Sequence, residues 1–344
     1  MAVTNDLVTD RRVARHCTAL REAGYEVTAI GRMQRMLFHQ GAGFYAEYNV
    51  RLLLRLLTMQ TDIVWANDTD TLPACRMAAR LKGCRLVMDQ HELFPEVPEL
   101  VGRERVKRVW EWFERRMMPK ADVLFTVCQS IADYYKELYG VEMTVVRNVG
   151  MRDCGNAGMR KCGNAGATLL YQGCVNKGRG VDWAIDAMAW LEGCRLVVAG
   201  GGDLLEEMKA YAASKPWADR ISFTGRLKPE ELMQLTAQAN VGLVMLEDLG
   251  LSYHYALPNR IGDFVAAGVP MVVSDLPEMA AIIRRFGIGE IISGTGAGKL
   301  AEAVKKVLAR EWKESDFDEA RKDMDWNKEK QILINTIKNL NVKP

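Results

Sequence analysis

The sequence predicts an α/β protein made of two doubly wound parallel sheets, and two observations support this fold class. Short runs rich in β-branched residues alternate with helical stretches along nearly the whole chain, which is typical of βαβ units. The alternation restarts after a segment of Gly, Asn and Ala near the middle, so each half can form its own sheet. A chain of 344 residues is long enough for two separate cores.

The first half begins with a short strand-like run, Ala2–Thr4. Val13, Cys17 and Leu20 then form one apolar helix face that Gly24 ends. Further strands are expected at Tyr25–Ile30, Asp62–Ala66, Arg85–Asp89, Asp122–Val127 and Thr144–Arg147.

The second half repeats this order of elements. Strands are expected at Thr168–Gln172, Arg195–Ala199, Ile221–Thr224, Val241–Met245, Pro270–Ser274 and Ile288–Ile292. A last amphipathic helix, around Trp326 and Gln331–Leu340, follows the second sheet.

The octapeptide MRDCGNAG at 151–158 is nearly repeated as MRKCGNAG at 159–166. Such a segment has almost no branched apolar residues, so it cannot form a core and is expected to be a linker. The alternative is a metal site, but Cys154 and Cys162 supply two thiols where structural zinc needs four ligands. We therefore expect domains at 1–150 and 168–322, a linker at 151–167 and a C-terminal helix at 323–344.

Composition excludes several classes of function. The charge balance of 46 basic against 44 acidic residues does not indicate a nucleic-acid-binding protein. No signal peptide and no apolar run of spanning length are visible, so a cytoplasmic protein with reduced cysteines is expected.

Three short motifs are weaker than they first look. SGTGAGKL (293–300) lacks the first glycine and the final Ser/Thr of a P-loop. AGGGD (199–203) is not a dinucleotide fingerprint, which weakens a dehydrogenase interpretation. DTD (68–70) could bind a metal, but Asp70 and Thr71 also suit the N-cap of a helix at Leu72–Leu81, which is the favoured interpretation.

Two stretches of the second half suit a nucleotide. YQGCVNKGRGVDWAIDA (171–187) places Lys177 and Arg179 in a glycine-rich loop between a strand and a helix, where they suit a diphosphate; the alternative is a solvated basic loop. LPNRIGDFVAAG (257–268) has Pro258 in the first turn of a helix. Asp263 in that helix could accept hydrogen bonds from a ribose diol, or be an exposed carboxylate.

These stretches, with GGGD at 200–203, ISFTGRLKPEEL at 221–232 and MDQHELFPEVPEL at 88–100, resemble the retaining GT-B glycosyltransferases of family 4. The resemblance covers nearly the whole chain. It implies two Rossmann-like domains facing a cleft, with the last helix crossing back to the first domain. It also implies a nucleoside-diphosphate sugar as donor, a glycan or glycolipid as acceptor, and no cofactor or metal.

The resemblance assigns roles residue by residue. It makes His91, Arg179 and Lys177 catalytic, although a lone histidine is more often a satisfied loop residue. The donor would contact Gly173, Gly201, Arg226, Leu227, Pro258, Asn259, Arg260 and Asp263, and the acceptor side would include Asn5, Asp6, Asp10 and Glu92. Two positions depart from the family pattern: Cys174 replaces an Arg, and Tyr255 replaces the first acid of a Glu-x7-Glu pair.

The implied function is sugar transfer in bacterial cell-surface polysaccharide or glycolipid synthesis. The departures at Cys174 and Tyr255 leave a non-catalytic sugar-nucleotide-binding protein as one alternative, and a GT-B epimerase is another. The helix-forming stretch RERVKRVWEWFERRMMPK (103–120) is basic and aromatic, so it predicts either peripheral contact with the inner face of a membrane or packing on its own sheet, the favoured interpretation.

Overall fold

The computed structural model of the protein describes residues 1–5, 7, 10–32, 36–149 and 166–342. It divides into two compact units. The first comprises Met1–Asn148, Gly250–Ser252 and Asn327–Pro344; the second comprises Val149–Leu249 and Tyr253–Trp326. The octapeptide repeat except its last residue, Gly166, lies outside the described residues, and so does most of the expected linker.

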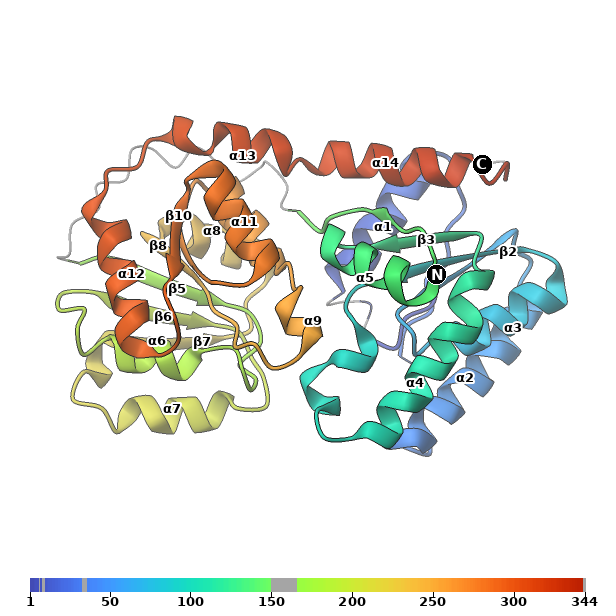
Figure 1. Ribbon diagram of the computed structural model, residues 1–344, viewed down its shortest axis with the longest axis horizontal. Coiled ribbons are helices and arrows are strands. Elements are labelled where there is room, and N and C mark those ends of the chain that lie inside the picture. The colour runs from blue at the N-terminus through green and yellow to red at the C-terminus, as the bar shows by residue number, and fades with distance from the viewer. Residues whose placement is uncertain (6, 8–9, 33–35, 150–165, 343–344) are drawn as a thin grey trace. The chain divides into compact units, whose positions relative to one another are not determined.

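The sheet of the first unit is parallel throughout, in the order β1-β2-β3-β4. Figure 1 shows α2, α3 and α4 along one face of this sheet and α1 with α14 on the other. The strands are β1 (Ile63–Asn67), β2 (Arg85–Gln90), β3 (Val123–Thr126) and β4 (Thr144–Val145). The helices are α1 (Arg11–Glu22), α2 (Gly41–Thr58), α3 (Leu72–Lys82), α4 (Glu104–Met117), α5 (Gln129–Tyr139) and α14 (Trp326–Lys338).

The strand expected at Tyr25–Ile30 is wrong over most of its length. Only Ile30 pairs, through a parallel bridge to Ala2, and Ala2 also bridges to Ala66 of β1. A strand needs a partner along its whole ladder. Ala2 and its neighbours give Tyr25–Ile30 a partner only at its end, so the remaining residues are extended chain without regular pairing.

The second unit has a parallel sheet in the order β10-β9-β8-β5-β6-β7. Its strands are β5 (Thr168–Gln172), β6 (Arg195–Ala199), β7 (Ile221–Gly225), β8 (Val241–Val244), β9 (Met271–Ser274) and β10 (Gly289–Ile292). Its helices are α6 (Val181–Ala187), α7 (Leu205–Ala213), α8 (Pro229–Gln238), α10 (Asn259–Ala266), α11 (Pro277–Phe286), α12 (Ala297–Ala309) and α13 (Asp318–Asp323); the short α9 (Leu251–His254) is shared by the two units.

The topology of this second sheet marks the place where a ligand is expected. The chain winds from β5 to β6 and β7 on one side, then returns to add β8, β9 and β10 on the other. In doubly wound sheets, ligands bind outside the carboxyl ends of the strands where the strand order reverses. Here that point lies between β5 and β8.

Burial explains why most strands could be found from sequence. Residues of β5, β8 and β9 such as Leu170, Val244 and Val272 are fully buried, so these strands form continuous apolar runs. The predictions at Thr168–Gln172 and Arg195–Ala199 are confirmed residue for residue. The other strands of the second unit differ by one residue at an end.

Candidate active site

In the second unit, the basic loop (residues 173–180) connects β5 to α6. Its backbone is joined to the glycine turn after β6, because Gly173 N–H donates to Ala199 O at 2.9 Å and Val175 N–H donates to Gly201 O at 3.0 Å. Gly200 has φ +154°, and a Cβ there would come within 1.8 Å of Gly173 O. Only glycine fits this approach, which gives the GGGD motif a physical reason.

The two cations of the basic loop differ in their surroundings. Lys177 is exposed, whereas Arg179 is half-buried and its guanidinium lies 4.7 Å from the centre of the Tyr253 ring. The buried Nε of Arg179 has no hydrogen-bond partner among the residues that the structure describes. Cys174, the departure from the family pattern, is exposed in the same loop. A stacked guanidinium with an unused donor suits an anionic ligand.

Arg260 is buried rather than presented to a ligand. It donates to the backbone oxygens of Gln172 at 2.9 Å and Met245 at 3.5 Å, and its guanidinium lies 4.8 Å from the Tyr171 ring centre. Gln172 ends β5 and Met245 follows β8, so Arg260 ties together the two strands at the switch point. Its role is therefore to hold the ends of these two strands together.

The expected ribose ligand Asp263 lies in the second turn of α10. Its Oδ2 accepts from Gln172 Nε2 at 3.0 Å, and Gln172 Oε1 accepts from Thr236 Oγ1 at 2.8 Å. Pro258 is the N-cap of α10, one residue earlier than the expected first turn, and it gives no side-chain cap. Asn259 is exposed at the first helical position. Because α10 follows β8 in the chain, its first amide groups, which carry partial positive charge, lie at the carboxyl edge of the sheet.

The remaining donor-side residues gather at the ends of β6 and β7. Gly201 lies against the side chain of Arg226, since a Cβ on it would come within 3.1 Å of Arg226 Nε. Leu227 is half-buried against the core of the unit. Tyr255 is half-buried, and its ring meets that of His254 edge-on at 4.9 Å. The structure thus brings the predicted donor residues to one edge of the second sheet.

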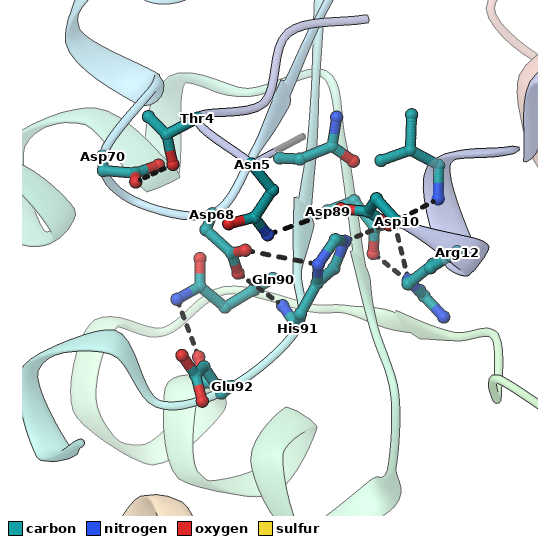
Figure 2. A network of polar contacts seen from close by, with 12 residues as sticks. Thr4, Asn5, Asp10, Arg12, Asp68, Asp70, Asp89, Gln90, His91 and Glu92 are labelled. Atoms are coloured by element: carbon teal, nitrogen blue, oxygen red, sulfur yellow. Dashed lines mark hydrogen bonds and ion pairs between the residues drawn. The ribbon is translucent and has the colours of Figure 1, made fainter. Parts of the chain in front are cut away.

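In the first unit, Figure 2 shows His91 between two carboxylates. Its Nδ1 lies 3.2 Å from Asp68 Oδ2 and its Nε2 lies 3.3 Å from Asp89 Oδ2, while its backbone N–H donates to Asp68 Oδ1 at 2.8 Å. Asp68 has a left-handed backbone with φ 59°, held by its own N–H bond to Asp89 O. The ring is therefore fixed at both nitrogens, and we call Asp68, Asp70, Asp89 and His91 the histidine site.

The carboxylates decide the charge of His91. Burial alone would lower the pKa of His91, but the Asp68 and Asp89 carboxylates outweigh burial and raise it to about 9. Burial alone would raise the pKa of Asp89, yet the Arg12 guanidinium, 2.6 Å away, and His91 hold it well below its usual range. At neutral pH His91 is a cation, so it can stabilise negative charge but cannot accept a proton.

Asp70 is the least satisfied member of the histidine site. It is 4% exposed, and its Oδ2 accepts from Thr4 Oγ1 at 2.5 Å, while its buried Oδ1 has no partner among the described residues. Burial and then the Asp68 charge raise the pKa of Asp70 to about 7. The capping role favoured for Asp70 is wrong: Thr71 is the N-cap of α3, and the Asp70 side chain turns to Thr4 instead.

The expected acceptor-side residues surround His91 (Figure 2). Asn5 Nδ2 lies 3.5 Å from Asp10 Oδ2, and Asp10 caps α1 by accepting from Val13 N–H at 3.0 Å. The backbone oxygen of Glu92 accepts from Gln90 Nε2 at 2.8 Å. Asp6 lies outside the described residues.

Sequence reasoning missed Arg12, Asp68 and Asp89 as parts of this site. The available signal was topological, because Asp68 and Asp89 stand at the carboxyl ends of neighbouring parallel strands, β1 and β2. Ala2 and β1 are also where this sheet reverses its strand order. Within the described part of the chain, no group of three His, Cys, Asp or Glu side chains is arranged to hold a metal ion.

Comparison with known families agrees with this geometry. The family described as Glycosyltransferase Family 4 matches residues 9–149, and the family described as Glycosyl transferases group 1 matches residues 166–310. The chain belongs to the family 4 glycosyltransferases of the GT-B fold. Both units are covered, each by the family model for its own half.

Similarity to individual proteins is lower. Two curated sequences from Mycobacterium tuberculosis strains, named GDP-mannose-dependent alpha-(1-6)-phosphatidylinositol monomannoside mannosyltransferase, are 28% identical over 127 residues. The match spans 34% of this chain and only 31% of each relative.

Solved structures share the GT-B fold over nearly the full length. Sucrose-phosphate synthase from Thermosynechococcus elongatus has a TM-score of 0.77 at 16% identity, covering 96% of this chain and 92% of its own. The lipopolysaccharide outer core galactosyltransferase WaaB has a TM-score of 0.69 at 13% sequence identity, and the match covers 98% of each chain. Anabaena HepE in complex with UDP-glucose has a TM-score of 0.70 at 14% sequence identity, and the match covers 94% of this chain and 88% of HepE.

Proposed function

We propose that this protein is a retaining glycosyltransferase that moves a sugar from a nucleoside-diphosphate sugar to an acceptor hydroxyl. The observation that carries the proposal is that Lys177 and Arg179 lie in the loop after β5, at the switch point of the second sheet, while the uncapped α10 follows β8 on the other side of that point. These groups concentrate positive charge where a diphosphate would bind. Family membership supports the same reaction class.

The proposed chemistry needs charge stabilisation more than a protein base. As the bond between the anomeric carbon and the diphosphate oxygen breaks, negative charge builds on the leaving group. Arg179, Lys177 and the α10 amide groups would stabilise that charge. The freed phosphate oxygen would take the proton of the acceptor hydroxyl, whose oxygen bonds to the anomeric carbon on the same face, so the configuration is retained.

His91 would act as a fixed cation within the histidine site. Because Asp68 and Asp89 keep His91 protonated and occupy both of its ring nitrogens, we assign it an electrostatic role toward the transferred sugar and no role as a base. Asp263 would hold the ribose, with its carboxylate oriented by Gln172. No metal is assigned to the reaction.

We further propose a lipid-linked or polysaccharide acceptor at the cytoplasmic face of a bacterial membrane. The curated relatives are named for a phosphatidylinositol mannoside acceptor, and WaaB for the lipopolysaccharide core. Among the described residues, no helix is both long and apolar enough to cross a bilayer. The membrane contact that we propose is peripheral.

The surface proposed for that contact is α4. Trp110 packs inward against Tyr45 and Phe94, at 5.0 Å between ring centres, whereas Trp112 is 53% exposed beside exposed arginines. An exposed aromatic among cations suits an anionic lipid surface. Co-sedimentation with vesicles containing phosphatidylglycerol tests this: Trp112→Ser should lose binding, and Trp190→Ser, at an equally exposed 52%, should not. Vesicle binding that changes neither with Trp112→Ser nor with salt concentration would rule this contact out.

The first test of the proposed reaction is calorimetric titration with UDP, GDP and ADP without metal, on the wild type, Arg179→Ala and Asp263→Ala. Micromolar binding of one nucleotide, lost in both variants, is the expected result. Incubation with the matching sugar nucleotides then separates the alternatives. Binding without transfer or hydrolysis would indicate a non-catalytic protein, and conversion of donor without acceptor would indicate an epimerase.

A further inference from the structure

Helix α4 carries a buried carboxyl group that the proposed mechanism does not use. Glu114 is 1% exposed, whereas Arg115 and Arg116, which follow it in the helix, are exposed. A buried carboxyl group is costly unless hydrogen bonds compensate the loss of water. The partners of Glu114 therefore indicate its role.

Three hydroxyl groups donate to the carboxyl group of Glu114. Its Oε1 accepts from Thr69 Oγ1 at 2.6 Å and from Tyr135 OH at 3.0 Å. Its Oε2 accepts from Tyr139 OH at 3.3 Å. Both tyrosines belong to α5, whereas Thr69 lies in the turn that follows β1, and Thr69 is fully buried. Glu114 thus connects α4 and α5 to the turn that contains Asp68.

The hydroxyl group of Thr69 also links Glu114 to the residues on each side of His91. A hydroxyl group has one hydrogen to donate, and the short contact directs it to Glu114, since Gln90 Oε1 is farther away at 3.3 Å. Thr69 Oγ1 then accepts from Gln90 Nε2 at 3.2 Å, and the same amide group donates to Glu92 O at 2.8 Å. Gln90 and Glu92 flank His91 in the chain (Figure 2). This chain of hydrogen bonds needs an acceptor at its end, and Glu114 is that acceptor.

The turn that Thr69 belongs to has a conformation that must be held in place. Asp68 has φ 59°, a left-handed conformation that costs free energy for a residue with a side chain and persists only where the surroundings fix it. The bond from Asp68 N–H to Asp89 O fixes Asp68 itself, and the bond from Thr69 to Glu114 fixes the next residue. Both carboxylate oxygens of Asp68 contact His91, one at Nδ1 and one at the backbone N–H. The position of the turn therefore sets the position of the His91 ring and its charge.

We propose that Glu114 is a positioning residue for the transfer reaction: through the Thr69 hydroxyl group it holds Asp68 in the conformation that orients His91. The effect on the reaction rests on the proposed function, whereas the effect on the His91 ring does not. Burial raises the pKa of Glu114 to about 7, against the three hydrogen bonds that lower it. Either protonation state leaves Oε1 free to accept from Thr69, so Glu114 acts as an acceptor and its charge is not required.

The first measurement is the titration of the His91 ring by NMR in the free protein, which needs no substrate. Thr69→Val keeps the shape of the side chain and removes its hydroxyl group, so the pKa of His91 should fall from about 9 to about 8 or below. Glu114→Leu should have the same effect. Thr69→Ser and Glu114→Gln keep the hydrogen bond and should restore the wild-type titration. Tyr135→Phe is the control, because it removes a different hydroxyl group from the same oxygen of Glu114 and should leave the titration unchanged.

The second measurement is hydrolysis of the sugar nucleotide whose nucleoside diphosphate binds best, with water as the acceptor. Thr69→Val should lower kcat by at least about tenfold and change KM for the sugar nucleotide by less than about threefold, because the proposed donor residues lie in the second unit. Tyr135→Phe should keep the kcat of the wild type.

A lower His91 pKa and a lower kcat in Thr69→Val, with neither change in Tyr135→Phe, would support the positioning role. An unchanged His91 pKa or an unchanged kcat in Thr69→Val would overturn it, because Glu114 would then serve only the stability of the fold. The same His91 shift in Tyr135→Phe would also overturn it, because any loosening around Glu114 would then suffice. If Glu114→Leu does not fold, Thr69→Val decides. A wild type that hydrolyses no sugar nucleotide would count against the proposed function, and the His91 titration would still decide whether Glu114 positions the ring.

Discussion

The histidine site and the basic loop place charge in opposite ways. In the histidine site the cations Arg12 and His91 lie within 3.3 Å of carboxylates of the same unit. In the basic loop, neither Lys177 nor Arg179 forms an ion pair with any described residue. Charge that is matched inside the protein fixes geometry, whereas charge left unmatched at a strand end is available to a ligand. The two sites should therefore respond differently to the loss of one group.

The largest effect is expected where the charge is matched. Asp89→Asn leaves Arg12 buried without its carboxylate, so the free energy of unfolding should fall by about 3–5 kcal/mol. Urea unfolding followed by circular dichroism measures this. Asp275→Asn removes the partner of the exposed Arg284, and should cost no more than about 1 kcal/mol. A similar decrease in the free energy of unfolding of both variants would contradict the distinction between the buried ion pair of Asp89 and the exposed one of Asp275.

The pH dependence of His91 sharpens the same contrast. Its pKa is raised to about 9 in the folded protein, so protonation stabilises the fold fully below the ordinary value of 6.5. That contribution, of up to about 3 kcal/mol, is lost as pH rises toward 9. The unfolding free energies of wild type and His91→Gln should therefore converge between pH 6.5 and 9. A constant difference across that range would show that the charge of His91 does not stabilise the fold.

Where the charge is unmatched, in the basic loop, a substitution should change ligand binding and leave the stability of the fold unchanged. Arg179→Ala should weaken binding of the preferred nucleoside diphosphate by about 30-fold, since hydrogen bonds to charged groups contribute about 1.5–3 kcal/mol. Its Tm should stay close to that of the wild type. Arg284→Ala, another arginine of the second unit but 61% exposed and paired with Asp275, serves as the control and should bind normally. A lower Tm of Arg179→Ala with unchanged nucleotide affinity would show that Arg179 stabilises the fold and does not bind the nucleotide.

The smallest effect is expected from adding a cation. Cys174 is exposed in the basic loop where the family pattern has an arginine. Cys174→Arg should tighten nucleotide binding about threefold to tenfold, with a steeper dependence on salt, because an exposed charge acts through solvent. Cys174→Gln serves as the control, because it adds a long polar side chain, as Cys174→Arg does, but no charge. Equal affinity of the two variants would mean that this position does not face the diphosphate.

The ease of prediction also differed between regions. The strands β8 and β9 of the second unit were found because they are buried on both faces and consist almost entirely of apolar residues. Tyr25–Ile30 shows an equally good pattern but pairs only at Ile30, because pairing depends on what lies beside a strand. In the same way, motifs located His91 and Arg179, but the roles of Asp68 and Arg260 depend on contacts between segments far apart in sequence. No local pattern indicates that Arg260, which was expected to contact the donor, is buried and donates to the backbone oxygens of Gln172 and Met245 instead.

Arg260 has a consequence for the thermodynamics of ligand capture. It fixes the ends of β5 and β8, while two backbone hydrogen bonds fix the basic loop to the glycine turn. The backbone of the donor edge is thus ordered before any ligand arrives, and little conformational entropy remains to be lost there on binding. A nucleotide should meet a preorganised surface on which only long side chains such as Lys177 need to settle. Its association should therefore be fast, and differences in affinity between nucleotides should be set mainly by their dissociation rates.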